Sequence, residues 1–173
     1  MAGSNGKQKS VRNMVLSLGV TVLAAGVIYL FVPHEDGEPD LPRVDYRVEL
    51  LTARRAASYP VVAPQGLPDS WKPTSVRFKG ADFDAWHLGF HTSAGEYVQV
   101  EQSAEKPSTF LEKATQGGRA TDVTEKIGER TWTRYTGGRY DALVHQEKGA
   151  TTVVAGTGSF EQLTQMAKAL RAE

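Results

Sequence analysis

The stretch AWHLGFHTSAGEYVQV, residues 85–100, decides the fold class of the larger part of this chain. Its apolar side chains recur at every second position, which is the period of a strand with one buried face. The Ala94-Gly95 pair separates two such runs and is typical of a turn. We therefore expect an antiparallel hairpin with one apolar face. That face carries Trp86, Leu88, Phe90, Val98 and Val100, and the opposite face carries His87, His91, Gln99 and Glu101.

The chain beyond this hairpin repeats the same plan. A helix is expected at 107–116, because Pro107 suits a first helical turn and Gly117 suits a helix end. A last helix begins at Ser159, which can form a capping box with Gln162 ahead of an apolar stripe. A hairpin followed by a helix thus occurs twice, which suggests two similar halves that share one sheet. The strands of the second half are expected at 121–127, 129–135, 140–146 and 151–155.

The segments before the hairpin contain a helix and a turn. The helix is expected at 44–58, where Asp45 can cap its start and Pro60 ends it. Residues 61–71 then give a short apolar run and a turn rich in proline and glycine. The expected fold class is α+β, with an N-terminal transmembrane helix followed by one antiparallel sheet that has helices packed on one face.

The segment MVLSLGVTVLAAGVIYLFV, residues 14–32, contains no charged residue. As a helix it would be about 28 Å long, which is close to the thickness of the hydrocarbon core of a bilayer. We expect it to cross the membrane, since a buried core helix of this length would normally show a polar stripe. A cleaved signal peptide is the other alternative. An uncleaved anchor is favoured over it, because apolar residues continue well beyond the small residues at 24–26, where cleavage would have to occur.

The charges around this segment predict its orientation. Lys7, Lys9 and Arg12 precede it and acidic residues follow it, so the N-terminus is expected in the cytoplasm and the large domain outside. The acidic stretch PHEDGEPDLP lacks the apolar surface to pack and should be a linker. The expected parts are a cytoplasmic basic tail at 1–13, a transmembrane helix at 14–32, an acidic linker at 33–43 and an extracytoplasmic α+β domain at 44–173.

The composition excludes several classes of site and partner. The chain has 20 basic and 20 acidic residues, and no segment after the tail concentrates lysine or arginine. This balance argues against nucleic acid as a partner, because phosphate binding needs a basic face. The chain has no cysteine, which excludes disulfides, thiolate metal sites and a cysteine nucleophile.

Histidines offer the first candidates for metal or acid–base chemistry. His87 and His91 share a strand face, but four strand residues separate them by about 13 Å, which is too far for one shared site. His145 could approach from another strand, and this depends on a pairing that the sequence does not fix. We expect solvated strand histidines and predict no catalytic residue, no cofactor site and no metal site.

Two other patterns have functional alternatives. Residues 156–159, GTGS, join an apolar strand to a helix start, where backbone amides can hold an anion. The lysine of a phosphate loop is missing, so a turn with a serine cap is favoured. A set of aromatic residues could line a groove for a sugar or peptide, although core packing explains them more simply. These are Trp71, Trp86, Trp132, Tyr97, Tyr135 and Tyr140.

Four segments together resemble a known family. They are VRNMVLSLGV at 11–20, YPVVAPQGLPDSW at 59–71, DAWHLGFHTSAGEYVQVEQS at 84–103 and VVAGTGSFEQLTQMAKAL at 153–170. The chain is similar, over nearly its whole length, to the uncharacterised actinobacterial family catalogued as domain of unknown function 4245. The resemblance implies a membrane-anchored envelope protein. It carries over no catalytic or binding residue, because the family has no assigned activity.

The sequence favours a non-enzymatic binding or accessory module of the cell envelope, because it has an anchor and a spacer and shows no catalytic constellation. Its partners would be the lipid bilayer, through residues 14–32, and an envelope protein, peptide or glycan. The alternative is an extracytoplasmic enzyme of hydrolase type without a recognisable motif. A pocket with converging titratable groups would favour that alternative.

Overall fold

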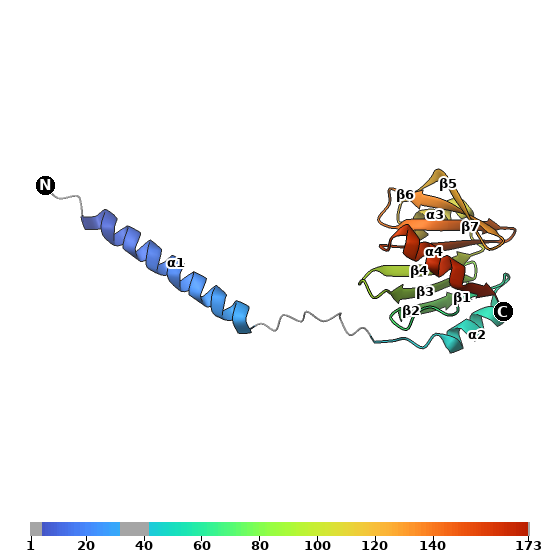
Figure 1. Cartoon of the computed structure of the whole chain (residues 1–173), viewed down its shortest axis with the longest axis horizontal. Helices are drawn as coiled ribbons and strands as arrows, with labels where there is room; N and C mark the ends of the chain where they lie inside the picture. The colour runs from blue at the N-terminus through green and yellow to red at the C-terminus, as the bar shows by residue number, and fades with distance from the viewer. Residues whose placement is uncertain (1–4, 32–41, 173) are drawn as a thin grey trace. The chain divides into compact units, whose positions relative to one another are not determined.

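The computed structural model describes residues 5–31 and 42–172 of the chain (Figure 1). The first of these parts is a single helix, α1 (Asn5–Phe31). Within it, Val11–Tyr29 is a 19-residue span with a mean hydropathy of 1.8, and none of it is buried. By length and composition this span suits either a membrane anchor or a signal sequence.

The described helix differs in length from the expected membrane segment. It begins at Asn5 rather than at residue 14, because residues 5–13 contain no proline and a helix can continue through polar residues into water. Val32 and most of the predicted linker at 33–43 lie outside the described residues, as do residues 1–4 of the predicted tail.

The second part folds around one sheet of seven strands in the order β2-β3-β4-β8-β7-β6-β5. All neighbouring strands are antiparallel, so the expected α+β class with one antiparallel sheet is confirmed. The strands are β2 (Lys72–Lys79), β3 (Ala85–His91), β4 (Tyr97–Ser103), β5 (Arg119–Ile127), β6 (Arg130–Thr136), β7 (Asp141–Glu147) and β8 (Ala150–Gly156). The other elements are α2 (Arg47–Ala56), α3 (Pro107–Ala114), α4 (Phe160–Ala169) and the antiparallel pair β1 (Val62–Pro64) and β9 (Leu170–Ala172).

Strands β3 and β4 form the hairpin that the alternating stretch predicts. Leu88 lies opposite Val100, and Phe90 lies opposite Val98. All four side chains are buried, so the apolar face of the hairpin is a core face. Gly95 in the turn has a φ of 76°, a backbone conformation that glycine adopts without steric cost.

Apolar side chains on both faces of the central strands explain where the helices pack. Leu143 of β7 and Val154 of β8 belong to the same core cluster as residues of α4. Their neighbours Val144 and Val153 point the other way and belong to a second cluster, with residues of α3. Figure 1 shows α4 lying across one face of the sheet. Helices therefore cover both faces rather than the one expected, because strands that are apolar on both sides must be buried on both sides.

The strand order matches two similar halves only in part. Strands β2, β3 and β4 form one meander before α3, and β6, β7 and β8 form another before α4. A two-fold rotation that exchanges the antiparallel neighbours β4 and β8 would leave both helices on the same face. Since α3 and α4 pack on opposite faces, no such rotation relates the halves.

The connections around α2 complete the larger core. Ala53 of α2 is fully buried against it. The helix begins at Arg47 and ends at Ala56, within the expected range 44–58. Asp45 accepts a hydrogen bond from the backbone N–H of Arg47 at 3.0 Å, which satisfies one donor at the helix start. The indole of Trp86 donates to the carbonyl oxygen of Val62 at 3.0 Å and so ties β3 to β1.

Candidate functional site

One half of a sheet face has no covering helix. Helix α3 packs against β7 and β8, so it covers the centre of its face and leaves β2, β3 and much of β4 uncovered. Gln99 fixes which side of β4 faces α3, because its Nε2 donates to the carbonyl oxygen of Ala114 at 3.3 Å. We call the uncovered surface the open face. It carries the side chains of Ser75, Arg77, Lys79, His87, His91, Tyr97 and Glu101.

A chain of hydrogen bonds runs across the three strands of the open face. The hydroxyl oxygen of Ser75 lies 2.9 Å from Nε2 of His87. Nδ1 of His87 lies 3.0 Å from Oε1 of Glu101. An ionised carboxylate only accepts hydrogen bonds, so this network assigns the hydrogen to Nδ1 and leaves Nε2 to accept from the Ser75 hydroxyl.

The register of the strands brings these residues together. His87 lies directly opposite Glu101 in the β3–β4 pair, and the Ser75 backbone lies opposite Gly89 in the β2–β3 pair. Neighbouring strands are about 4.8 Å apart, which is within reach of these side chains. A Cβ on Gly89 would lie 2.4 Å from both the Ser75 hydroxyl oxygen and the Tyr97 hydroxyl oxygen. The glycine therefore provides the space in which the two hydroxyls meet.

Tyr97 adds a second hydroxyl to the network. Its oxygen lies 3.5 Å from Nε2 of His87, and it hydrogen-bonds with Ser75. Burial is the largest effect and raises the pKa of the Tyr97 phenol above its ordinary value. The hydrogen bond with Ser75 lowers this pKa, the nearby Tyr140 and Glu101 raise it, and Arg77 has the smallest effect and lowers it. The phenol is therefore neutral at physiological pH and can act as a hydrogen-bond donor.

A groove of about 250 Å³ opens on this face between the sheet and α3. Glu101 is paired with His87, and Glu105 accepts from Lys113 at 3.2 Å. Among the residues that the structure describes, the two cations of β2 in this groove form no ion pair. The groove is lined by Arg77, Lys79, Asp82, Ala85, Trp86, His87, Glu101, Ser103, Glu105, Phe110 and Lys113.

His145 lies on the other side of the sheet and does not join the open face. Its ring packs near Trp132, with ring centroids 5.5 Å apart, and Trp132 belongs to the α4 side of the core. Nδ1 of His145 lies 2.8 Å from the carbonyl oxygen of Thr131, and Nε2 lies 2.7 Å from Oε1 of Glu147. The approach of His145 to His87, which the sequence left open, does not occur.

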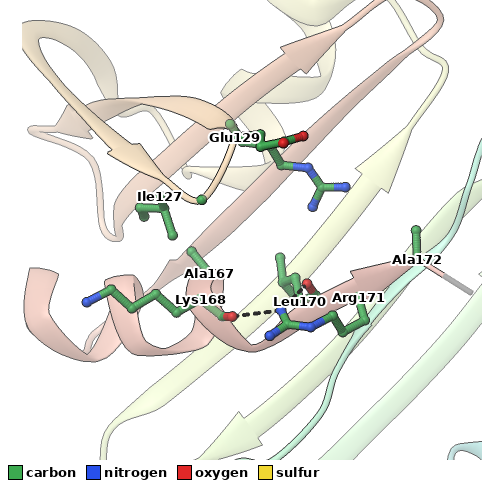
Figure 2. A pocket seen from close by; sticks show the side chains of 9 residues that line it. Ile127, Glu129, Ala167, Lys168, Leu170, Arg171 and Ala172 are labelled. Carbon is green, nitrogen blue, oxygen red and sulfur yellow. Dashed lines mark hydrogen bonds between the residues drawn. The ribbon is translucent and has the colours of Figure 1, made fainter.

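A larger groove, of about 590 Å³, lies between the β5–β6 turn and the end of α4 (Figure 2). Arg171 is one of the cations that line it. Its Nη1 donates to the carbonyl oxygens of Lys168 and Leu170, each at 2.8 Å. The guanidinium therefore caps carbonyl groups at the C-terminal end of α4. Figure 2 shows the side chain of Lys168 pointing away from Arg171, and Ile127 and Ala167 present only short apolar groups. The polar groups do not converge, so we assign no site here.

The remaining sequence candidates have structural roles. Ser159 forms the predicted capping box with Gln162 at the start of α4, and a Cβ on Gly156 would lie 1.9 Å from the carbonyl oxygen of Tyr97. The glycine of that loop is thus required by close packing between strands. All three tryptophans are buried in the core, so they form no aromatic groove. Within residues 5–31 and 42–172, no three histidine, aspartate or glutamate side chains gather in a way that would hold a metal ion.

Sequence reasoning missed the contribution of β2 to this site. Residues 74–79, TSVRFK, alternate Ser75, Arg77 and Lys79 with Val76 and Phe78, and this alternation was the signal for a strand with one polar face. His87 and His91 do share a strand face, as predicted. The partner of His87 is a carboxylate on the next strand rather than a second histidine.

Comparison with known proteins places the chain in one family. No curated protein matches the chain. A family model described as a protein of unknown function, DUF4245, matches residues 7–170. The match includes all of α1 except its first two residues, and every strand of the seven-stranded sheet. Because it extends over almost the entire length of the chain, this protein belongs to the DUF4245 family.

Proposed function

We propose that this chain is a single-pass membrane protein of the cell envelope, whose extracytoplasmic domain is a module that binds a peptide through the open face. The apolar span Val11–Tyr29 supports an anchor. Lys7, Lys9 and Arg12 on one side of it and acidic residues on the other support a cytoplasmic N-terminus. The domain would then lie outside the membrane.

One observation carries the binding proposal, namely that the groove contains cations without an internal partner. The carboxylates of Glu101 and Glu105 are already engaged by His87 and Lys113. The exposed side chains of Arg77 and Lys79 are not engaged in this way, and they lie on the same side of β2. Their positive charge is therefore available to a ligand.

A short peptide with a free carboxylate fits this arrangement. The planar guanidinium of Arg77 can donate to both oxygens of a carboxylate at once, and Lys79 adds a second positive charge two residues along the strand. Asp82, in the same groove, can accept a hydrogen bond from a peptide amide. A groove of about 250 Å³ holds only a few residues of such a peptide.

The test is a titration of full-length protein in detergent micelles with fluorescein-labelled trialanine, followed by fluorescence polarisation. Trialanine with a free C-terminal carboxylate should bind about tenfold or more tightly than its C-terminal amide, because charged hydrogen bonds contribute about 1.5 to 3 kcal/mol each. Arg77→Gln should remove this preference. Arg119→Gln, on exposed β5, is the matched control and should keep it. Equal binding of acid and amide to the wild-type protein would contradict the proposal.

The proposed orientation is tested separately. Protease added to intact spheroplasts should digest the domain and leave a small membrane-protected fragment. Digestion that occurs only after lysis would place the domain in the cytoplasm.

A further inference from the structure

The hydroxyl, imidazole and carboxylate of the open face stand in the order of a nucleophile, its base and the group that orients the base. The distances are 2.9 Å from the Ser75 hydroxyl oxygen to Nε2 of His87 and 3.0 Å from Nδ1 to Glu101. This order does not depend on any particular fold or sequence spacing. We propose that Ser75 is a nucleophile that attacks acyl esters, with His87 as its general base and Glu101 as the residue that positions His87.

The partial burial of the pair supports this role. The side chain of His87 is 17% exposed and that of Glu101 is 22% exposed. At this exposure the carboxylate is screened less than on an open surface, so it can stabilise the imidazolium that forms when His87 takes a proton. Glu101 also holds the hydrogen on Nδ1, which directs the lone pair of Nε2 towards Ser75.

The reaction conserves atoms and charge in two stages. The Ser75 oxygen forms a bond to the ester carbonyl carbon while its proton passes to Nε2 of His87. The bond between that carbon and the alcohol oxygen then breaks, and the leaving alkoxide takes the proton from His87 to give free alcohol and an acylated Ser75. Water attacks the acyl carbon, its proton passes to His87 and then to the departing Ser75 oxygen, and the acid is released.

Side chains rather than backbone amides would stabilise the negative charge on the carbonyl oxygen. Amides of a sheet point in its plane towards neighbouring strands, whereas the substrate would lie above the face. The neutral hydroxyl of Tyr97, which contacts both Ser75 and His87, is a suitable donor. Arg77, two residues along β2, adds a positive charge on the same side.

The substrate class rests on the proposed function, in which Arg77 and Lys79 bind a carboxylate. In the substrate, that free carboxylate would belong to the acyl part of the ester. Two strand residues separate the α-carbons of Ser75 and Arg77 by about 7 Å. An ester with a carboxylate a few bonds from its carbonyl carbon can span these two residues. The preferred substrate is therefore an ester of a dicarboxylic acid with one carboxylate free.

Two measurements on full-length protein in detergent micelles test the nucleophile. A fluorophosphonate probe should label the wild-type protein, with Ser75 as the modified residue by mass spectrometry of the peptides, and Ser75→Ala should not be labelled. Mono-p-nitrophenyl succinate should release p-nitrophenol faster than p-nitrophenyl acetate does. Ser108→Ala, an exposed serine of α3 away from the groove, is the matched control and should behave as wild type.

The positioning role of Glu101 has its own readout. Glu101→Gln should lower kcat by about a hundredfold or more while KM changes little, because the residue acts on His87 and not on bound substrate. No label on Ser75 in the folded wild-type protein would overturn the nucleophile, whatever the variants do. Labelling and hydrolysis without a preference for the succinate ester would keep the nucleophile and overturn the peptide-carboxylate ligand instead.

Discussion

Ser58 donates two hydrogen bonds to the carboxylate of Asp84, from its hydroxyl at 2.7 Å and from its backbone N–H at 2.9 Å. The hydroxyl bond, together with the N–H bond, holds the pKa of Asp84 below its ordinary value. The hydroxyl of Tyr59 donates to the backbone carbonyl of the same aspartate. Asp84 thus joins the segment after α2 to the β2–β3 connection, next to the open face.

We expect Asp84→Asn to destabilise the domain near neutral pH and to have little effect in acid. A carboxyl whose folded pKa lies below its unfolded pKa stabilises the fold above the unfolded value, and this contribution disappears as the pH falls through the folded pKa. Asparagine tolerates the φ of 55° at this position. The loss of stability should therefore come from removal of the negative charge. Urea unfolding, followed by the fluorescence of the buried tryptophans, measures the difference at pH about 7 and about 2.

The matched control for this charge is Asp122→Asn, on exposed β5. It should unfold at the same urea concentration as wild type at both pH values. An equal destabilisation by Asp84→Asn at both values would mean that the ionised carboxylate is not the cause.

A buried glutamine offers a second test, of the fold itself. Oε1 of Gln102 accepts from the backbone N–H of Val62 at 2.7 Å, and its Nε2 donates to Pro60 and Thr152. Gln102→Leu leaves that N–H without its partner inside the core, which should cost about 1 to 3 kcal/mol of unfolding free energy. Denaturant unfolding gives the value, and exposed Gln146→Leu should change it by less than about 0.5 kcal/mol. If Gln102→Leu leaves the unfolding free energy unchanged, water reaches the N–H of Val62 and satisfies it.

Gly89→Ala should damage the open face more than the fold. The added Cβ collides with the far ends of two side chains, Ser75 and Tyr97, which can swing away at a cost of about 1 to 3 kcal/mol. Binding of the carboxylate peptide and labelling of Ser75 should both fall about tenfold. Gly80→Ala, where the nearest atom lies 3.6 Å away, is the control and should retain both. Unchanged labelling of Gly89→Ala would mean that the hydroxyls do not need this space.

The alternation along the chain was enough to predict the β3–β4 hairpin and the sheet, because burial on one face imposes a period of two. The alternation in residues 74–79 of β2 was missed, because it contains only two apolar positions, Val76 and Phe78, and follows Lys72 and Pro73. The sequence signal for helices on both faces is in β8, where the consecutive apolar residues Val153, Val154 and Ala155 are all buried. A run without polar positions is what burial on both faces requires.

The candidate site depends on strand pairing, which a single sequence does not fix. His87 and Glu101 belong to one hairpin, so their pairing follows from the turn at residues 94–95. Ser75 joins them only because the β2–β3 pair has a register shift between Pro73 and Ser75. The position of such a shift is set by packing of the whole sheet, and no local pattern around Ser75 reveals it.

The anchor is tested by a charge within α1. Placing arginine at Val22 should cost about 2.5 to 3.5 kcal/mol of insertion free energy and reduce the fraction of protein that resists carbonate extraction from membranes. Val123→Arg, at a position of β5 that is 50% exposed, is the control and should leave extraction unchanged. If Val22→Arg integrates as well as wild type, this helix does not anchor the protein. A mature N-terminus at or after Val27 would show instead that the segment is a cleaved signal.

The most direct test of the open face is the response of the histidine rings to ligand. Full-length protein labelled with nitrogen-15 at its 4 histidines is examined by NMR in detergent micelles, with and without trialanine that has a free carboxylate. His87→Gln and His145→Gln assign the ring signals, and His145, on the opposite face, is the internal control. We predict that the His87 ring signals shift on saturation with the peptide while those of His145 stay in place. A shift of His145 without one of His87, or no shift at saturating peptide, would contradict binding at the open face.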